Sequence, residues 1–337
     1  MAQERGIIPT MSFDEIPVLD AAAAIAASAK IDRPWSTGYY AMYSSWLGGI
    51  VTDPVLMTIP IDDHLVHRGD GVFEAIKFTQ GKIFALDEHL LRLERSSVFA
   101  QLKIPGGIAA VRAIVLRTTM VAARDDGIIR IYISRGPGGF SANPYESVAP
   151  QIYIAITAPA LAMSAKRKTG CRSGRSSYTA KQGWFAAVKS CNYLQNALMK
   201  KEAIDAGLDF TLSLDDRGYI AEGSTENCAI VDHLGAFLYP SFRQALRGIT
   251  LECAVEAATR LKVLGVVTDI READISVEDI GRARELIFFG TTIDAMPAAM
   301  FDGHHIGEGK PGAVALAIQT DLEMQMSSGP RLTLLRT

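Results

Sequence analysis

Two spacings of apolar residues alternate along the chain and predict a mixture of strands and helices. Ile128–Ser134 and Gln151–Thr157 are short runs rich in β-branched residues, which is typical of strands. In Asp87–Leu102 the apolar positions instead recur every three or four residues, so a helix with one apolar face is expected. The residues of that face are Leu86, Leu90, Leu93 and Val98.

The first half of the chain also contains signals for a hairpin and a second helix. Gln80–Gly81 separates the apolar runs Val72–Phe78 and Lys82–Leu86, which is the pattern of a β-hairpin turn. Gly106–Ala123 has the length and composition of a helix. The segment Gly136–Pro144, rich in Gly and Pro, is expected to be a loop between two strands.

The second half repeats this mixture. A helix is expected from near Asn192 to Ala206, because Asn192 and Gln195 have the spacing of a capping box and Gly207 follows the last helical residue. A hairpin is expected around a turn at 215–218. The other predicted elements are strands Phe210–Leu214, Tyr219–Val231 and Leu286–Phe289 and helices Thr250–Leu264 and Ser276–Ala283.

A chain of 337 residues with this alternation is long enough for two domains. We expect an α/β (α+β) fold, with a smaller N-terminal α/β domain over residues 1–163 and a larger C-terminal domain over 179–337. The polar and basic stretch 164–178 has little periodicity, so it is expected to be the interdomain loop. A ligand site is expected in the cleft between two such domains.

Composition and charge narrow the class of protein. Lys and Arg number 34 against 37 Asp and Glu, so the formal net charge is −3, which argues against a nucleic-acid or anionic-membrane partner. No apolar run is long enough for a membrane span, and Met1–Pro17 lacks the apolar stretch of a signal peptide. The cysteines and histidines form no metal-ligand motif, so no metal and a reducing, cytoplasmic location are expected.

Lys189 is the first candidate for chemistry. A lysine acts as a nucleophile or base only when it loses its proton near neutral pH, which burial and nearby positive charge promote. Lys189 follows the apolar run Trp184–Val188 and precedes the predicted helix, whose positive end disfavours an ammonium group. Lys200 and Lys201, near the other end of that helix, are expected to be structural. Because a lysine in this place can also be an ordinary surface residue, its companions decide the interpretation.

Two carboxylates follow in a strand-like segment. A carboxylate beside the pyridine nitrogen of a cofactor keeps that nitrogen protonated, and Glu222 at the end of the predicted strand suits this role. Glu226 falls on the same strand face and stays a competing candidate. An exposed hairpin glutamate is the alternative interpretation of Glu222.

Several segments have the features of a phosphate anchor, which needs backbone N–H groups at a helix start together with hydroxyl groups or an arginine. Gly248 and Thr250 stand at a predicted helix start, and Thr291–Thr292 follows a predicted strand. Arg92 shares a face with Glu88 on the helix of the first half. The alternative interpretations are that Thr250 is a simple helix cap and that Arg92 is an i,i+4 partner of Glu88.

Taken in order, these segments resemble the class IV (fold type IV) pyridoxal-phosphate-dependent aminotransferase family, which includes branched-chain aminotransferases, D-amino acid aminotransferases and aminodeoxychorismate lyases. The resemblance implies pyridoxal 5′-phosphate in the cleft between two α/β domains, and a homodimer. The matching segments are Gly69–Glu74, Glu88–Leu93, Val188–Leu194, Glu222–Asn227, Arg247–Thr250 and Gly290–Thr292.

The resemblance also implies roles for individual residues. Lys189 would form the Schiff base with the cofactor. Glu222 would be the partner of the pyridine nitrogen, and Tyr193 would stand near the phenolic oxygen. The residues implied to hold the phosphate are Arg92, Ile249, Thr250, Thr291 and Thr292.

The substrate side is less uniform. Asp62–Gly69 is similar to a plant-type branch that contains D-amino acid aminotransferases and aminodeoxychorismate lyases. Ile128 stands where branched-chain enzymes have a tyrosine, although Arg130 matches the arginine that follows it. Arg68 and Arg130 are the candidates to bind a substrate carboxylate, with Phe73 as an apolar wall, and either arginine can equally be a structural ion-pair partner.

The predicted function is transfer of an amino group between a branched-chain or D-amino acid and a 2-oxo acid, with Lys189 as the base that takes the α-proton. One alternative is 4-amino-4-deoxychorismate lyase, because Ile133–Gly139 resembles the loop of the lyases. That enzyme would eliminate pyruvate and would need no 2-oxo acid acceptor. A minor alternative is a non-catalytic relative that binds the cofactor, which the intact pair of Lys189 and Glu222 disfavours.

Overall fold

The computed structural model of the chain describes residues 16–159, 163 and 165–335. Chain contacts divide it into two compact units, residues 1–37 and 38–337. In the first unit, helix α1 (Ala21–Lys30) is capped by Asp20, whose carboxylate accepts a hydrogen bond from the Ala23 backbone N–H. Residues 1–15, within the stretch where no signal peptide is expected, lie outside the described part.

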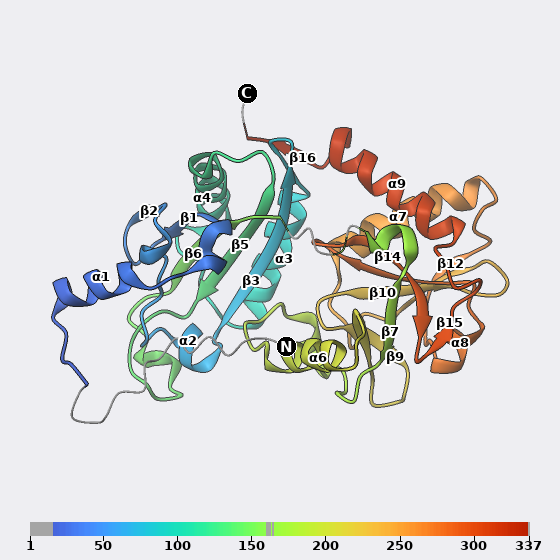
Figure 1. The fold of residues 1–337 in the computed structure, drawn as a ribbon, viewed down its shortest axis with the longest axis horizontal. Helices are drawn as coiled ribbons and strands as arrows, with labels where there is room; N and C mark the ends of the chain where they lie inside the picture. The colour runs from blue at the N-terminus through green and yellow to red at the C-terminus, as the bar shows by residue number, and fades with distance from the viewer. Residues whose placement is uncertain (1–15, 160–162, 164, 336–337) are drawn as a thin grey trace. The chain divides into compact units, whose positions relative to one another are not determined.

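The second unit contains two sheets, of which the first is antiparallel throughout (Figure 1). Its strands are β1 (Tyr39–Ser44), β2 (Gly49–Val51), β3 (Gly71–Thr79), β4 (Lys82–Phe84), β5 (Gly127–Ser134), β6 (Gln151–Thr157) and β16 (Leu332–Leu334). They lie side by side in the order β16-β4-β3-β5-β6-β1-β2. The last strand of the chain therefore pairs with a hairpin from its first half.

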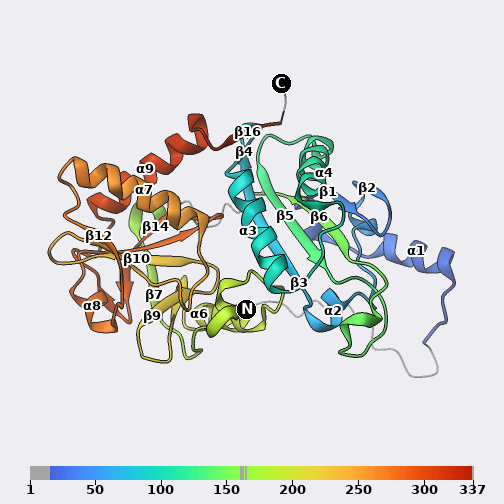
Figure 2. The same cartoon turned by 180° about the vertical axis from the view of Figure 1, so that it is seen from behind.

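Alternation along β5 separates the two faces of this sheet. Every second residue from Ile129 to Ile133 is fully buried beneath α3 (Leu86–Phe99) and α4 (Gly107–Ala122), which pack on the sheet as Figure 2 shows. The residues between them, including Arg130, lie on the opposite face and are less buried. One face of the first sheet is thus an apolar core, and the other is free to carry a site.

The elements expected in the first half are confirmed: the hairpin, both helices and both strands are present. One position of the predicted helix face is wrong, because Val98 is 72% exposed and Ser97 is buried in its place. Ser97 follows Leu93 by four residues and so continues the row of Leu86 and Leu90, whereas Val98 is turned about 100° further around the helix.

The second sheet has nine strands and mixes parallel with antiparallel pairs. Its strands are β7 (Cys171–Arg175), β8 (Phe210–Leu214), β9 (Ile220–Gly223), β10 (Asn227–Val231), β11 (Phe237–Pro240), β12 (Ile270–Ala273), β13 (Glu285–Gly290), β14 (Asp294–Phe301) and β15 (His304–His305). The order is β12-β11-β10-β13-β14-β7-β8-β9, and β15 pairs with β14. Helices α7 (Ile249–Val263) and α9 (Ala313–Ser328) pack against each other and against β13 and β14.

The expectation of a loop over 164–178 is corrected. Helix α5 (Lys166–Thr169) and strand β7 lie within this stretch, and β7 is an inner strand between β14 and β8. The strand carries no apolar alternation because its buried positions include Ser173 and Gly174, and a Cβ at Gly174 would come within 3.0 Å of the Leu208 side chain. The division into domains at residues 163 and 179 stays a prediction.

The remaining predicted helices are present with shorter bounds. Ser276 caps α8 (Val277–Arg282) through a capping box, and the helix expected from Asn192 is α6 (Leu194–Asp205). Within the described part of the chain, no helix combines the length and the apolar character needed to cross a membrane. The other short elements are α2 (His64–Arg68) and the 3-10 segments η2 (Pro34–Gly38), η3 (Pro54–Leu56), η4 (Pro144–Glu146) and η5 (Gly183–Ala187).

Candidate active site

One pocket brings three of the predicted site residues together. Lys189 lies just after η5, Tyr193 directly precedes α6, and Glu222 lies near the end of β9. All three line the same cavity although Glu222 is distant from the others in the sequence. Other polar residues that line it are Lys181, Asn196, Ser224, Thr225, Glu226 and Asn227.

The first sheet fixes the position of Lys189. Phe73 N–H on β3 donates a hydrogen bond of 2.9 Å to the Lys189 carbonyl, and the Lys189 N–H donates to Ser96 Oγ on α3. Lys189 Nζ lies 4.5 Å from the centroid of the Phe73 ring, and that ring meets Tyr193 edge to face at 5.1 Å. Phe73 therefore packs against two residues that line the pocket, and its role as an apolar wall of the substrate site stays a prediction.

The environment of Lys189 favours its neutral form. Burial, and then the positive charge of Arg92, lower the pKa of the Lys189 amine to about 8. The carboxylates of Glu74 and Glu222 act in the opposite direction without cancelling the shift. A usable fraction of the amine is unprotonated near neutral pH, which is the state that acts as a nucleophile or base.

The capping box expected from Asn192 and Gln195 is wrong, whereas the burial expected from the apolar run before Lys189 is present. Helix α6 begins at Leu194 without a side-chain cap. Asn192 donates instead to the Gly69 carbonyl, and Gln195 donates to the Thr179 carbonyl. Both side chains are drawn away because tertiary neighbours offer acceptors, so the capping box does not form.

Glu222 is a carboxylate that keeps one oxygen free. Its Oε2 accepts a hydrogen bond of 2.9 Å from Leu246 N–H, and its Oε1 has no partner among the described residues. Burial raises the pKa of Glu222, while the Leu246 N–H and the charges of Lys181 and Lys189 oppose this shift. The free oxygen can accept a proton or a hydrogen bond from a ligand in the pocket.

Glu226 has no such freedom. The segment Tyr219–Val231, expected as one strand, is broken into β9 and β10 by a turn at 224–226. Glu226 folds back onto this turn, where it accepts hydrogen bonds from Thr225 N–H at 2.9 Å, from Ser224 Oγ at 3.2 Å and from Thr225 Oγ1. The structure therefore separates the two competing carboxylates that strand parity could not.

Arg92 belongs to a buried charged cluster with Glu74 and His89. Its Nε and Nη2 donate to both oxygens of Glu74 at 2.7 and 2.8 Å, and His89 Nδ1 lies 2.7 Å from the same carboxylate. Burial alone would raise the pKa of Glu74, but Arg92 and His89 hold it well below its usual range. Glu88 pairs with Arg331 instead, so the i,i+4 interpretation of Arg92 is wrong.

The cluster leaves Arg92 able to bind an anion. Its Nη1 donates to the Arg247 carbonyl at 2.9 Å, which with the two Glu74 bonds uses three of the five N–H groups of a guanidinium. The remaining N–H groups, on Nη1 and Nη2, can each donate to a phosphate oxygen.

The start of α7 supplies further donors. Gly248 is its N-cap without a side-chain cap, and Thr250 is the second helical residue, so the interpretation of Thr250 as a cap is wrong. A Cβ at position 248 would stand 1.8 Å from Asn227 Oδ1, so any larger residue would displace the Asn227 side chain. The N–H groups of Ile249 and Thr250 thus face outward from a helix start, where anions bind.

The other predicted phosphate residues lie in the turn after β13. Thr291 lines a small cavity together with Ile249, Thr250 and His89. Thr292 is in the same turn and half-buried, but it does not line that cavity. The structure therefore brings Ile249, Thr250 and Thr291 together and leaves Thr292 beside them.

The two candidate substrate arginines differ in their surroundings. Arg130 is paired with Ala75 across β3 and β5, on the same sheet face as Phe73, and has no hydrogen bond or ion pair in the part of the chain that the structure describes. Arg68 is exposed and donates to the His67 carbonyl at 2.8 Å and to the Phe140 carbonyl. Arg130 is the freer cation.

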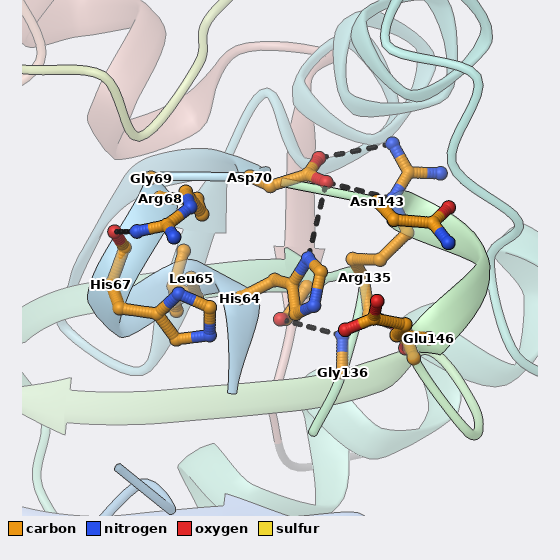
Figure 3. Close-up of polar contacts among 12 residues, drawn as sticks. His64, Leu65, His67, Arg68, Gly69, Asp70, Arg135, Gly136, Asn143 and Glu146 are labelled. Atoms are coloured by element: carbon orange, nitrogen blue, oxygen red, sulfur yellow. Dashed lines mark hydrogen bonds and ion pairs between the residues drawn. The ribbon is translucent and has the colours of Figure 1, made fainter. Parts of the chain in front are cut away.

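Figure 3 shows the surroundings of Arg68 at the end of α2. Asp70 accepts hydrogen bonds from Arg135 at 2.8 and 3.0 Å, and His64 Nδ1 lies 3.9 Å from Oδ2 of the same carboxylate. These bonds tie the α2–β3 junction to the loop after β5. This junction continues into the backbone that holds Lys189.

Sequence reasoning missed Lys181 and Asn196, both of which line the pocket. Asn196 donates to the Ser224 carbonyl, but its Oδ1 is buried without a partner among the described residues. Lys181 Nζ lies 5.1 Å from the centroid of the Tyr193 ring and 5.7 Å from the centroid of the Phe185 ring. Their sequence neighbourhoods carry no motif, so only the fold reveals them.

The sequence model of the amino-transferase class IV family matches residues 71–301, and the chain belongs to this family. The chain is 36% identical over 293 residues to the chloroplastic D-amino-acid transaminase of Arabidopsis thaliana, covering 87% of this chain and 78% of the relative. It is 31% identical over 272 residues to a putative branched-chain-amino-acid aminotransferase of Methanocaldococcus jannaschii, covering 80% and 91%.

Solved structures agree with this assignment. The branched-chain amino acid aminotransferase of Escherichia coli superposes with a TM-score of 0.81 at 25% identity, covering 88% of this chain and 100% of that one. A second branched-chain enzyme, crystallised with pyridoxamine 5′-phosphate, gives the same TM-score of 0.81 at 25% identity, covering 88% and 99%. The chain is an α/β, fold type IV, pyridoxal-phosphate-dependent aminotransferase, as the sequence motifs predict.

Proposed function

We propose that this enzyme moves the amino group of a D-amino acid to a 2-oxo acid, with Lys189 as its proton-transferring base. The observation that carries the proposal is that the buried Lys189 amine and the Glu222 carboxylate line one pocket. The pKa of the amine is about 8, and only one oxygen of the carboxylate is hydrogen-bonded among the described residues. The plant transaminase relative supports a D-amino acid substrate.

The donor set fits pyridoxal 5′-phosphate. Arg92, the open start of α7 at Ile249 and Thr250, and the Thr291–Thr292 turn would hold the phosphate. Glu222 would partner the ring nitrogen, and the partnerless Asn196 Oδ1 marks a place in the pocket where a donor is missing. Tyr193 would stand at the phenolic oxygen. When bound, the cofactor supplies an aldehyde that reacts with amines and a ring that withdraws electrons from the reacting carbon.

The residues of the chain then divide the work. Lys189 Nζ, shifted toward its neutral form by burial and Arg92, accepts the proton that leaves the α-carbon of the amino acid. Glu222 Oε1 accepts a hydrogen bond while Leu246 N–H fixes the other oxygen. Arg130 offers an unpaired cation to the substrate carboxylate, and Phe73 closes the wall beside it.

A branched-chain L-amino acid is the second candidate substrate, because the solved structures with the same fold are named as branched-chain enzymes. The lyase alternative is disfavoured, because these relatives and solved structures are all named as transaminases or aminotransferases. A lyase would release pyruvate without any 2-oxo acid acceptor.

Half-reactions test the substrate assignment. The purified yellow holoenzyme is mixed with single L- and D-amino acids in the absence of a 2-oxo acid, and the visible cofactor band is followed. We expect D-amino acids to convert the band at least about tenfold faster than their L-enantiomers. Faster conversion by L-leucine or L-valine would favour the branched-chain candidate. Pyruvate release from aminodeoxychorismate without acceptor would overturn the transaminase proposal.

We further propose that the chain acts as a homodimer in a reducing, cytoplasmic compartment. The four cysteines are free, which fits a reducing environment. Phe140 and Tyr145, in the loop after β5, are 60% and 92% exposed and could be covered by a second copy. Light scattering at micromolar concentration tests the dimer, since a mass near 36.4 kDa would contradict it and twice that mass would support it.

A further inference from the structure

Two lysines, not one, belong to the active-site pocket. Lys181 lines it together with Lys189 and Glu222. Neither the sequence motifs nor the expected cofactor contacts give Lys181 a role. Its ammonium has no hydrogen bond and no ion pair among the described residues, and its polar contacts are with aromatic rings.

The two ammonium groups lie on linked aromatic rings. Lys181 Nζ is 5.1 Å from the centroid of Tyr193, and Lys189 Nζ is 4.5 Å from that of Phe73. The two rings meet edge to face, with 5.1 Å between their centroids and an angle of 87° between their planes. The aromatic pair therefore connects the two amines, and both lysines line the same pocket as Glu222.

An unpaired, largely desolvated ammonium is costly, so an apolar residue would stabilise this position better. Burial lowers the pKa of Lys181, and the negative charge of Glu222 opposes that shift. Lys181 therefore shares the pocket with Lys189 and with Glu222, whose negative charge favours the ammonium form of Lys181. The positive charge of a protonated Lys181 disfavours protonation of the Lys189 amine.

We propose that Lys181 is a positioning residue that, from the wall of the shared pocket, favours the neutral form of the Lys189 amine for reaction with the cofactor aldehyde. It acts through the electrostatic field of the pocket and rests on the proposed role of Lys189. The charged or titratable groups that face Lys189 are Glu74 of β3, His89 and Arg92 of α3, Glu222 of β9, and Lys181, Cys191 and Tyr193 of its own segment. Among these, Arg92 and Lys181 are the cations that lower the pKa of Lys189; Arg92 has the larger influence and is paired with Glu74, whereas Lys181 is unpaired among the described residues.

Cofactor uptake by the full chain measures this effect without substrate turnover. Holoenzyme is stripped of cofactor and mixed with pyridoxal 5′-phosphate between pH 6 and 10, and the rate of growth of the visible band is recorded. Only the neutral amine reacts, so the rate should rise with a midpoint near pH 8 in the unmodified chain. In Lys181→Gln the midpoint should rise by about half a pH unit, which makes uptake at pH 7 about threefold slower.

Matched variants separate charge from packing. Lys181→Arg keeps the positive charge and should restore the original midpoint. Lys200→Gln is the control, because Lys200 also lies over an aromatic ring, Phe210 at 5.3 Å, but outside the pocket. It should leave the midpoint unchanged. Thermal unfolding of each cofactor-free variant checks that the fold is intact, and Lys181→Met replaces Lys181→Gln if the glutamine variant fails to fold.

Two outcomes would overturn the proposal. An unchanged midpoint in Lys181→Gln would make Lys181 a packing residue only. An unchanged midpoint with a higher KM for the amino acid would make it a substrate contact. A separate variant tests the role of Lys189: if Lys189→Ala takes up the cofactor with the same band and rate as the unmodified chain, the proposed function fails whatever Lys181 does.

Discussion

The pocket around Lys189 and the cluster around Glu74 both hold buried charged groups and treat them in opposite ways. Glu74 accepts hydrogen bonds on both oxygens and its pKa is lowered, whereas Glu222 has one free oxygen and its pKa is raised. Arg92 is paired and its pKa is raised, whereas the pKa of Lys189 is lowered.

Glu74, Glu222, Arg92 and Lys189 are all withdrawn from water, so burial does not explain the difference. They differ in the hydrogen-bond and ion-pair partners that each of them has. Where hydrogen bonds and opposite charge compensate for lost hydration, the charged form is kept and the group holds structure. Where they do not, the neutral form gains and the pKa of the group moves toward neutral pH. The cluster is the scaffold, and we propose that the pocket is where protons move.

The largest expected effect is on activity. Replacing Lys189 with alanine should lower kcat at least about a thousandfold, a loss of about 4 kcal/mol, because no other amine of the described residues lies over Phe73. Steady-state transamination measures it. Lys200→Ala, whose amine donates to the Asp209 carbonyl on the surface, should retain full activity. A near-normal kcat in Lys189→Ala would contradict the proposal that protons move in the pocket around Lys189.

Breaking the cluster should instead cost stability. Glu74→Gln leaves the buried Arg92 without its ion-pair partner, so the free energy of unfolding should fall by about 3 kcal/mol. Urea unfolding of the cofactor-free chain measures this. Glu94→Gln, on the exposed side of the same helix as Arg92, should change stability little. If both variants unfold alike, the cluster is not a scaffold.

The cluster should also make the fold sensitive to acid. The folded-state pKa of Glu74 lies below its ordinary 4.5 and that of His89 below 6.5. Groups with lowered values stabilise the fold above their ordinary pKa, and that stabilisation is lost as pH falls. Stability should therefore decline from pH 6.5 downward, and more steeply below pH 4.5. Glu74→Gln should flatten the lower part of this decline, and an equally steep decline would contradict the assignment.

The smallest expected effect has the opposite sign. Because Lys189 and Glu222 are held against their charged forms, Lys189→Met or Glu222→Gln should stabilise the cofactor-free chain at pH 7 by about 1 kcal/mol. The Glu222→Gln gain should vanish below pH 4.5, where the carboxyl is neutral in both states. Urea unfolding at about pH 7 and about pH 4 checks this. A loss of stability at neutral pH would show that the charged forms of Lys189 and Glu222 are compensated by their surroundings in the folded chain.

Much of the fold could be predicted from the chain itself. Helix α3 follows from the spacing of its apolar residues and the β3–β4 hairpin from its turn. Strands β5 and β6 follow from their β-branched residues, and helix α4 follows from its length and composition. Strand β7 could not be predicted, because its buried positions are small or polar residues that only the neighbouring strands accommodate.

Ordered motifs along the chain were enough to find the candidates: Lys189, Glu222, Arg92, the start of α7 and the Thr291 turn. What each of them meets depends on the folded arrangement. Folding frees Glu222 rather than Glu226, pairs Arg92 with Glu74 rather than Glu88, and places Lys181 in the pocket. Burial and pairing of a charge depend on groups distant in sequence, so no local pattern can encode them.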